Sequence, residues 1–211
     1  MVMMYVEGGG DTASLRRECR KGFTQFITKA GIKNRPRVVA CGSRQEAYEH
    51  FCMAISNGED ALLLVDSEEV IAGTHQADSQ KPETWLPWQH LKQRIGDGWD
   101  KPEGSLDTDC HLMVQVMESW FLADRNVLVD FFGQGFKENS LPNAANAIES
   151  VSKSQVYSGL STATYNCKTK GAYGKGEHSF ELLAKINPEK ICAASPWAKR
   201  FIDQLRIKMD G

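Results

Sequence analysis

Three acidic residues, Glu7, Asp66 and Glu68, follow short apolar stretches of the sequence and together can bind a divalent metal ion. Carboxylate oxygens are preferred ligands of hard cations such as Mg²⁺. Asp66 and Glu68 are two positions apart, and alternate residues of an extended segment point the same way, so both can contact one ion. Two such ions, about 3.5–4 Å apart, clamp the attacking and leaving oxygens of a phosphoryl transfer. The alternative interpretation of Asp66 and Glu68 is a polar turn that simply ends a strand.

The elements that must position these acids are predicted from apolar runs and helix caps. Residues 2–6, 37–41 and 61–65 are predicted strands, and the last is a continuous apolar run, typical of a strand buried on both faces. A helical spacing of apolar residues follows the first strand, and Ser43 and Glu46 form a capping-box pattern for a second helix. The order β-α-β-α-β predicts an α/β fold with a parallel sheet and right-handed crossovers.

A parallel sheet brings acids at the carboxyl ends of its strands to one edge, which is where ligands bind in open α/β sheets. Glu7 follows the first strand, and Asp66 follows the third. Residues 111–116 are predicted to form a fourth strand, which ends just before Glu118. Glu118 can join the metal site. Alternatively, it is an acid in the first turn of a helix predicted at 117–124, where the helix dipole favours it.

Residues 69–110 form a long polar segment that holds Trp85, Trp88 and Trp99. A loop of this length inside a compact domain is usually functional or partly structured. The three tryptophans can form a lid or a base-stacking wall, or they can anchor the segment on the sheet. A short helix is predicted within it at residues 88–94.

The second half of the chain is predicted to be helical. Residues 1–125 are expected to form the metal-binding α/β domain, and residues 126–211 a helical extension packed on it. The helices expected in the extension span residues 127–132, 144–151, 179–186 and 196–207.

A local basic segment lies between residues 151 and 176, in a chain whose formal net charge is only −2. A protein that wraps duplex DNA over a broad face is usually basic, so any contact with nucleic acid is expected to be local. Lysines contact phosphates and tyrosines stack on bases, which makes this segment a candidate nucleic-acid-binding surface. A solvated loop is the alternative. Its lysines and tyrosines are Lys153, Lys168, Lys170, Lys175, Tyr157, Tyr165 and Tyr173.

Three glycines, Gly8, Gly9 and Gly10, separate the first strand from the first predicted helix. Backbone N–H groups at a helix N-terminus can cradle a phosphate. The stretch lacks the Gly-Lys-Ser/Thr ending of a nucleotide-binding P-loop. A tight turn that lets a phosphodiester approach the backbone is therefore the favoured interpretation.

The composition favours an ordinary globular protein of the cytoplasm. Hydrophobic residues make up 41% of the chain and charged residues 25%, close to average usage. The six cysteines include no C-x-x-C pair and several fit apolar core positions, which is typical of a reducing compartment. No apolar run approaches the roughly 18 residues of a membrane span. No signal peptide is predicted either, so we expect no membrane partner.

The pattern Glu7-Gly8-x-x-Asp11 followed by Asp66-x-Glu68 resembles the TOPRIM signature, which topoisomerases, primases and OLD-type nucleases share. Longer stretches are similar to an uncharacterised bacterial TOPRIM-like family, and the similarity covers nearly the whole chain. These stretches include Leu64-Val65-Asp66-Ser67-Glu68, Met117-Glu118-Ser119-Trp120 and Lys175-Gly176-Glu177-His178-Ser179-Phe180. Members of that family are often encoded beside ATPases in what look like phage-defence cassettes.

The resemblance implies a TOPRIM-like fold and assigns roles to the matching residues. Glu7 corresponds to a first-strand glutamate that is a metal ligand or a general acid/base. Asp66 and Glu68 correspond to a metal-binding Asp-x-Asp pair, except that Glu replaces the more usual second Asp. Asp11 corresponds to an acid that helps to hold a second metal in OLD-type enzymes; the alternative is an N-cap of the first helix. Lys175 lies in one of the similar stretches, and a lysine beside the metals can stabilise transition-state charge.

These expectations combine into a Mg²⁺- or Mn²⁺-dependent nuclease that cleaves a phosphodiester with a metal-activated water. Its expected substrate is DNA or RNA, its expected partner is an ATPase, and a homodimer is a further possibility because related nucleases are usually dimers. One alternative is a catalytically silent TOPRIM-like module that binds an ATPase or nucleic acid. Another is a metal-dependent nucleotide phosphohydrolase.

The structure can separate these functions by geometry. Carboxylates of Glu7, Asp66 and Glu68 that lay too far apart to share a cation would exclude the enzyme. An open basic groove beside the acids would favour a polymeric substrate, and a closed pocket would favour a small one.

Overall fold

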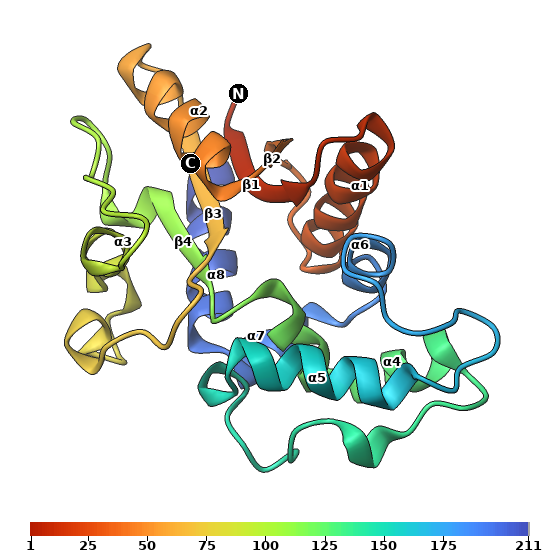
Figure 1. Cartoon of the computed structure of the whole chain (residues 1–211). Coiled ribbons are helices and arrows are strands. Elements are labelled where there is room, and N and C mark those ends of the chain that lie inside the picture. The colour runs from red at the N-terminus through yellow and green to blue at the C-terminus, as the bar shows by residue number, and fades with distance from the viewer. Residues whose placement is uncertain (211) are drawn as a thin grey trace.

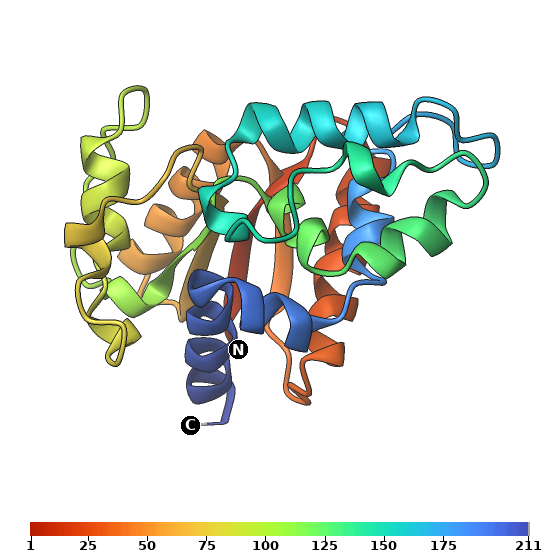
Figure 2. The same ribbon diagram turned by 90° about the horizontal axis from the view of Figure 1, so that it is seen from below.

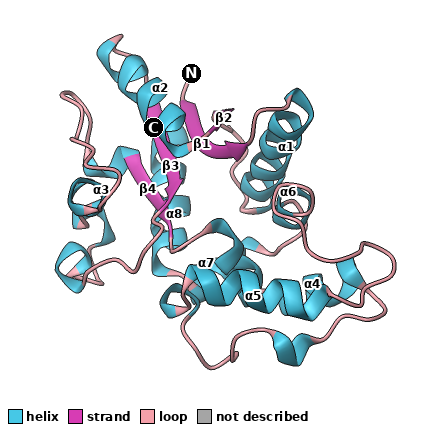
Figure 3. Cartoon of the chain, in the orientation of Figure 1, coloured by secondary structure: helices cyan, strands magenta, loops and turns pink. Residues whose placement is uncertain are grey.

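Four parallel strands form the centre of the structure, a computed structural model that describes residues 1–210. The strands lie in the order β2-β1-β3-β4, with helices on both sides of them (Figure 3). This arrangement confirms the predicted α/β fold with a parallel sheet. β3 is an inner strand and every one of its residues is buried, as its continuous apolar run predicted. The bounds are β1 Met3–Gly9, β2 Arg37–Gly42, β3 Ala61–Asp66 and β4 Cys110–Met113.

Two helices connect the first three strands and cover opposite faces of the sheet (Figure 1). α1 (Ala13–Lys29) begins after Thr12, whose hydroxyl oxygen accepts a backbone N–H three residues further on at 3.2 Å. α2 (Arg44–Ser56) begins with the expected capping box between Ser43 and Glu46. These caps satisfy N–H groups that have no partner inside the helix. Both helices therefore begin at the carboxyl edge of the sheet, directly after a strand has ended.

Alternate residues of the strands pack into two separate cores, because successive side chains of a strand point to opposite faces. Met4 and Leu64 face α1 and the C-terminal helices. Tyr5 and Leu63 face α2 and residues 69–110. Figure 2 shows the strands enclosed between these two sets of elements.

Residues 69–110 fold into short helical turns against the α2 face of the sheet. The segment contains η1 (Gly73–Gln76), η2 (Pro82–Thr84), α3 (Pro87–Gln93) and η3 (Asp107–Asp109), so the helix predicted at 88–94 is confirmed. Trp85, Trp88 and Trp99 are only 3%, 3% and 5% exposed and belong to the α2-side core. The tryptophans therefore anchor the segment, and the prediction that they form a lid or a base-stacking wall is wrong.

The chain beyond β4 is helical and shares the core of the sheet. Leu128, Leu160 and Phe201 belong to the same apolar cluster as Met4 and Leu64. Its elements are η4 Met117–Ala123, α4 Arg125–Phe132, η5 Glu138–Ser140, η6 Ile148–Ser150, α5 Lys153–Thr164, α6 Ser179–Leu183, α7 Pro188–Ala194 and α8 Pro196–Asp210. Among the described residues, no helix is both long and apolar enough to cross a bilayer.

The predicted helix at 144–151 is wrong, because only the short η6 turn forms there. The Asn143 side-chain oxygen accepts the Ala145 backbone N–H at 3.0 Å, and the Asn143 carbonyl accepts the Asn146 N–H at 3.0 Å. Such local bonds give the backbone an alternative to the helix. The helix predicted at 117–124 is a 3₁₀ helix, η4, rather than an α-helix.

Part of the predicted basic loop is also helical. α5 begins with a capping box between Ser152 and Gln155, a sequence pattern that indicates the start of a helix. The interpretation of this stretch as a solvated loop is therefore wrong over the length of α5.

Candidate metal centre

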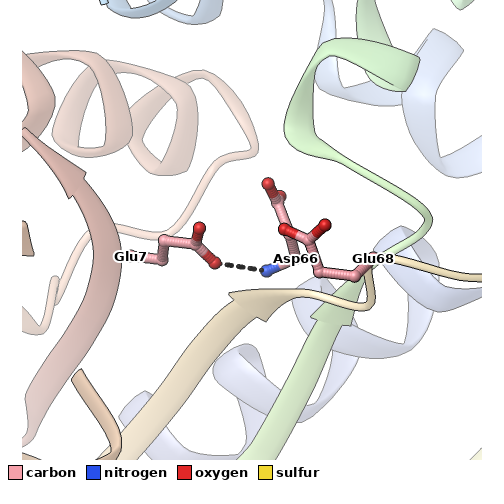
Figure 4. Close-up of side chains that lie close together, drawn as sticks. All are labelled: Glu7, Asp66 and Glu68. Atoms are coloured by element: carbon pink, nitrogen blue, oxygen red, sulfur yellow. Dashed lines mark hydrogen bonds between the residues drawn. The ribbon is translucent and has the colours of Figure 1, made fainter. Parts of the chain in front are cut away.

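The carboxylates of Glu7, Asp66 and Glu68 converge at the carboxyl edge of the sheet (Figure 4). Each offers an oxygen atom, and these atoms all lie within 4.8 Å of one another. β1 and β3 are neighbours, with Val6 opposite Leu64, so the acids near the ends of the two strands meet. The distance condition for sharing a cation is therefore fulfilled.

Glu68 reaches the cluster by a route that differs from the expected one. It does not continue an extended strand, because β3 ends at Asp66 and the Glu68 backbone has a left-handed φ of 65°. Its N–H donates to the Gln115 carbonyl at 2.7 Å, and the Ser67 N–H donates to the Met113 carbonyl at 2.9 Å. These two bonds hold the turn in a conformation that non-glycine residues rarely adopt. The turn, rather than strand alternation, brings Glu68 back towards Asp66.

Burial makes the two strand-end carboxylates unfavourable as anions. The pKa of Asp66 is raised well above its usual value, first by burial and then by the charges of Glu7 and Glu118. Burial likewise raises the pKa of Glu7, although the Arg44 guanidinium and a backbone N–H of Asp66 act in the opposite direction. A bound cation would remove this penalty, since an opposite charge nearby favours the ionised carboxyl. An all-oxygen set of three carboxylates fits Mg²⁺ or Mn²⁺.

Two basic side chains already contact the acids. Arg44, at the start of α2, lies 3.5 Å from Glu7 Oε2, donates to the carbonyl of Asp66 and pairs with Asp97 at 2.5 Å. Lys153, at the start of α5, forms an ion pair with Glu68. Burial raises the pKa of Glu68, but the hydrogen bond and charge of Lys153 outweigh it, and the net shift is downward.

Arg44 and Lys153 differ in how visible they are as candidate site residues in the sequence. Arg44 carried no signal, because an arginine in the first turn of a helix is unremarkable in a sequence. Lys153 stood out only as one member of the basic segment, 85 positions away from its partner Glu68.

Glu118 lines the same cavity but has different partners. It is 1% exposed, and its oxygens accept hydrogen bonds from the hydroxyls of Tyr157 at 3.1 Å, Tyr173 at 2.9 Å and Ser179 at 3.1 Å. Burial and then the charge of Glu118 raise the pKa of both tyrosines, so they remain donors. Glu118 is therefore a carboxyl group whose oxygens are hydrogen-bonded by the protein itself, and they are not part of the three-acid cluster.

A cavity of about 260 Å³ opens beside the acids. Its wall includes the glycine turn, Gly8 to Gly10, at the end of β1, where a Cβ on Gly9 would lie 2.8 Å from the Arg16 Cα and Gly9 has a φ of 92°. Only glycine fits this close approach. The remaining wall is apolar apart from the acids, Lys175 and Ser179. The lining residues are Glu7, Gly8, Gly9, Gly10, Leu15, Gly42, Asp66, Met113, Met117, Glu118, Lys175, Gly176, Ser179 and Phe180.

Among the residues predicted to bind nucleic acid, Lys175 alone lines this cavity. Its ammonium lies 5.4 Å from the ring centre of Tyr157, and its charge lowers the pKa values of Glu7 and Asp66, although other effects dominate those shifts. Lys175 is thus a basic group that shares the cavity with Glu7 and Asp66, whereas Arg44 and Lys153 pair directly with acids of the cluster.

The other predicted residues lie elsewhere. Asp11 is exposed and does not line the cavity, and the helix cap is its neighbour Thr12. Lys168 is exposed, whereas Lys170 pairs with Glu181 at 3.1 Å. Tyr173 turns its hydroxyl inward to Glu118, so its predicted role in stacking on a base is replaced by a structural one.

Comparison with known proteins identifies the family but not an activity. The family described as Domain of unknown function (DUF4276) matches residues 6–206, and the chain therefore belongs to it. No curated protein matches the chain, and no solved structure matches it.

Proposed function

We propose that this member of the DUF4276 family is a divalent-metal-dependent nuclease with a TOPRIM-like active site. One observation carries the proposal: Glu7, Asp66 and Glu68 place carboxylate oxygens within 4.8 Å of one another at the carboxyl edge of a parallel sheet. Ligands bind at this edge in open α/β folds. Burial raises the pKa values of Glu7 and Asp66, so a bound cation would favour their ionised forms.

In this proposal Glu7, Asp66 and Glu68 hold Mg²⁺ or Mn²⁺. A bound ion lowers the pKa of a water and stabilises charge on the phosphate. The chain itself supplies the surrounding functions. The glycine turn lets the substrate approach the backbone, and Lys175 balances the negative charge of the phosphate.

Glu7 is the proposed acceptor of the proton from the attacking water, because its carboxylate lines the cavity beside the other acids of the cluster, within reach of a water held there. The water oxygen then forms a bond to phosphorus, and the bond from phosphorus to the leaving oxygen breaks. The leaving oxygen takes a proton from solvent and departs as a hydroxyl group.

The direct test is incubation with Mn²⁺ or Mg²⁺ and a panel of DNA and RNA substrates. We expect the wild-type chain to cleave at least one of them, and Glu7→Gln to cleave none. Glu69→Gln is the matched control, since Glu69 is an exposed acid one position from Glu68. Cleavage that persists in Glu7→Gln would exclude the proposed mechanism.

A catalytically silent module is the second candidate, and the ion pairs of Arg44 and Lys153 favour it. These side chains neutralise part of the acid cluster without a metal. Titration calorimetry with Mn²⁺ separates the two functions. Binding that is lost in Asp66→Asn supports the enzyme, whereas absence of binding to the wild-type chain supports the silent module.

The proposed biological setting follows from the resemblance to TOPRIM-like proteins of phage-defence cassettes. In that setting the nuclease is an effector whose cleavage is controlled by a partner ATPase. Coexpression with an ATPase encoded beside it is expected to change the cleavage rate. An unchanged rate would remove the partner from the proposal and leave the nuclease itself standing.

A further inference from the structure

The basic residues of this chain are concentrated in one part of it. Residues 13–37 contain eight of the 25 lysines and arginines but only one of the 27 acids, Glu18. The remainder of the chain therefore holds 17 basic and 26 acidic residues. The chain has a net charge of only −2 but contains a strongly basic segment, and most of that segment is α1.

The charges of α1 lie on its outer side. Helical rotation of about 100° per residue places Arg16, Arg17, Arg20 and Lys21 on one face. The opposite face buries Cys19, Gly22, Phe23, Phe26 and Ile27 in the core. Figure 1 shows α1 at one flank of the molecule, next to α6.

Arg35 extends this row towards the far end of the helix, because its guanidinium donates to the Thr28 hydroxyl at 2.9 Å. Thr28 lies on the same outer side as Arg17 and Lys21, about three turns beyond Arg17 and two turns beyond Lys21. We call Arg16, Arg17, Arg20, Lys21 and Arg35 the α1 basic face.

The charges of this face are largely free to bind an anion. Glu18 lies 3.7 Å from Arg17 and 3.8 Å from Lys21, in exposed pairs that contribute little free energy. Within residues 1–210, Arg20 has no acidic partner within the 4.0 Å of an ion pair. Glu18, beside Arg17 and Lys21, and Glu46, whose pKa the charge of Arg16 helps to lower, are the acids that face these five basic side chains.

The α1 basic face begins at the wall of the acidic cavity. Arg16 Nε donates to the Gly10 carbonyl at 3.1 Å, and Gly10 and Leu15 both line the cavity. From Arg16 to Thr28, which holds Arg35, the α1 basic face covers about 12 helical residues, so at about 1.5 Å per residue it is roughly 18 Å long. The row of positive charge thus runs from the candidate metal centre along one flank of the molecule.

We propose that the α1 basic face binds the sugar-phosphate backbone of a nucleic acid whose cleaved phosphate lies at Glu7, Asp66 and Glu68. This inference rests on the proposed nuclease function and specifies a polymeric substrate. A length of roughly 18 Å matches about five phosphates of one strand at about 3.4 Å each. A mononucleotide would fill the cavity of about 260 Å³ and leave these charges unused. The face, rather than the basic segment before His178, is the main phosphate-binding surface.

The test compares two triple variants of the full chain with equal changes in charge. Arg17→Glu, Arg20→Glu and Lys21→Glu together reverse the α1 basic face, while leaving Arg16 at the cavity wall in place. Lys81→Glu, Lys92→Glu and Lys137→Glu form the control, since these three lysines are exposed and lie on other elements. Glutamate is a good helix former, so α1 should persist. Equal thermal unfolding midpoints will verify this.

Binding of labelled 20-nucleotide DNA and RNA, single-stranded and duplex, is measured in the Glu7→Gln background, so that the result does not depend on cleavage. At 100 mM salt we expect the α1 variant to bind about tenfold or more weakly. The slope of the logarithm of its binding constant against the logarithm of the salt concentration should be shallower by about 2 to 3. The control variant should bind within about twofold of the parent at the same salt. The four substrates report which nucleic acid the face prefers.

A second measurement separates this inference from the proposed function. With Glu7 present, Mn²⁺-dependent hydrolysis of bis(p-nitrophenyl) phosphate should be unchanged in the α1 variant, because none of its three substituted residues lines the cavity that holds this small diester. No hydrolysis by the parent would defeat the proposed function, whereas the binding data would still decide the role of α1. The inference is overturned if no nucleic acid binds the parent, or if both triple variants weaken binding equally. If the α1 basic face binds an acidic protein instead, no nucleic acid will bind the parent chain.

Discussion

Two buried carboxylates line the same cavity, yet their surroundings differ. Glu118 is 1% exposed and accepts hydrogen bonds from three hydroxyl groups. Asp66 is 4% exposed, and within the described residues its carboxylate accepts one hydrogen bond, from the Met117 N–H at 2.7 Å. Charges on Glu7 and Glu118 also oppose its ionisation. The protein satisfies the oxygens of Glu118 with its own donors and leaves the Asp66 carboxylate with one, which is the difference expected between a structural carboxylate and the proposed metal ligand.

Replacing each carboxylate in turn should produce the largest contrast. Asp66→Asn is expected to lower metal-dependent cleavage by about a thousandfold, because a bound ion supplies several kcal/mol of transition-state stabilisation. Glu118→Gln should lower it by only about tenfold, since Glu118 acts on the site through its neighbours. Single-turnover cleavage assays in Mn²⁺ measure both effects. Equal losses in the two variants would show that Glu118 is also a ligand.

The hydroxyl donors of Glu118 should matter for stability. Tyr173→Phe removes one of them and is expected to reduce the free energy of unfolding by about 2 kcal/mol, the usual contribution of a hydrogen bond to a charged group. Tyr165→Phe is the matched control, because Tyr165 is 77% exposed and should tolerate the change. Urea denaturation of both variants gives the comparison. A similar stability for Tyr173→Phe and the wild type would contradict the structural role of Glu118.

The metal-free protein should lose stability as the pH rises. The pKa of Asp66 is higher in the folded chain than its ordinary value of 3.8, so the folded state retains the proton longer than the unfolded state. The stabilisation from this proton is complete below about pH 4 and disappears as the pH passes the folded pKa. In EDTA, Asp66→Asn should therefore have a flatter pH profile of Tm than the wild type. Added Mg²⁺ should restore the wild-type Tm at alkaline pH; parallel profiles for the two proteins would refute this.

The smallest expected effect concerns the cation that already pairs with an acid of the cluster. Lys153→Met removes the partner of Glu68 and should strengthen Mn²⁺ binding several-fold, because the ion no longer competes with the ammonium group. Lys168→Met is the control, since Lys168 is exposed and does not line the cavity. Calorimetric titration reports the change. Weaker binding in Lys153→Met would mean that Lys153 positions Glu68 for the metal instead of competing with it.

The sequence predicts the fold best where the signals are local. The caps at Thr12 and at Ser43 lie within a few residues of the N–H groups that they satisfy. The continuous apolar run of β3 predicts that this strand is buried on both faces. The convergence of Glu7 and Asp66 follows from the parallel order of the strands. These features depend on periodicity and capping, which a single sequence contains.

The rest of the site depends on contacts between distant residues. Lys153 pairs with Glu68 from 85 positions away, and Tyr173 donates to Glu118 from 55 positions away. No local pattern distinguishes such residues from ordinary surface lysines and tyrosines. The turn at Glu68 was equally hidden, because glutamate is not a residue that usually adopts a positive φ.

The left-handed backbone of Glu68 has a consequence for how this position tolerates change during evolution. A left-handed residue with a side chain costs roughly 1–2 kcal/mol relative to its preferred conformation, and glycine would avoid that cost. Selection for stability alone would therefore favour glycine at position 68, at the expense of the carboxylate. A glutamate here carries a backbone cost, and the proposed metal site accounts for its presence. Relatives that lack such a site should be free to drift towards glycine or asparagine at this position.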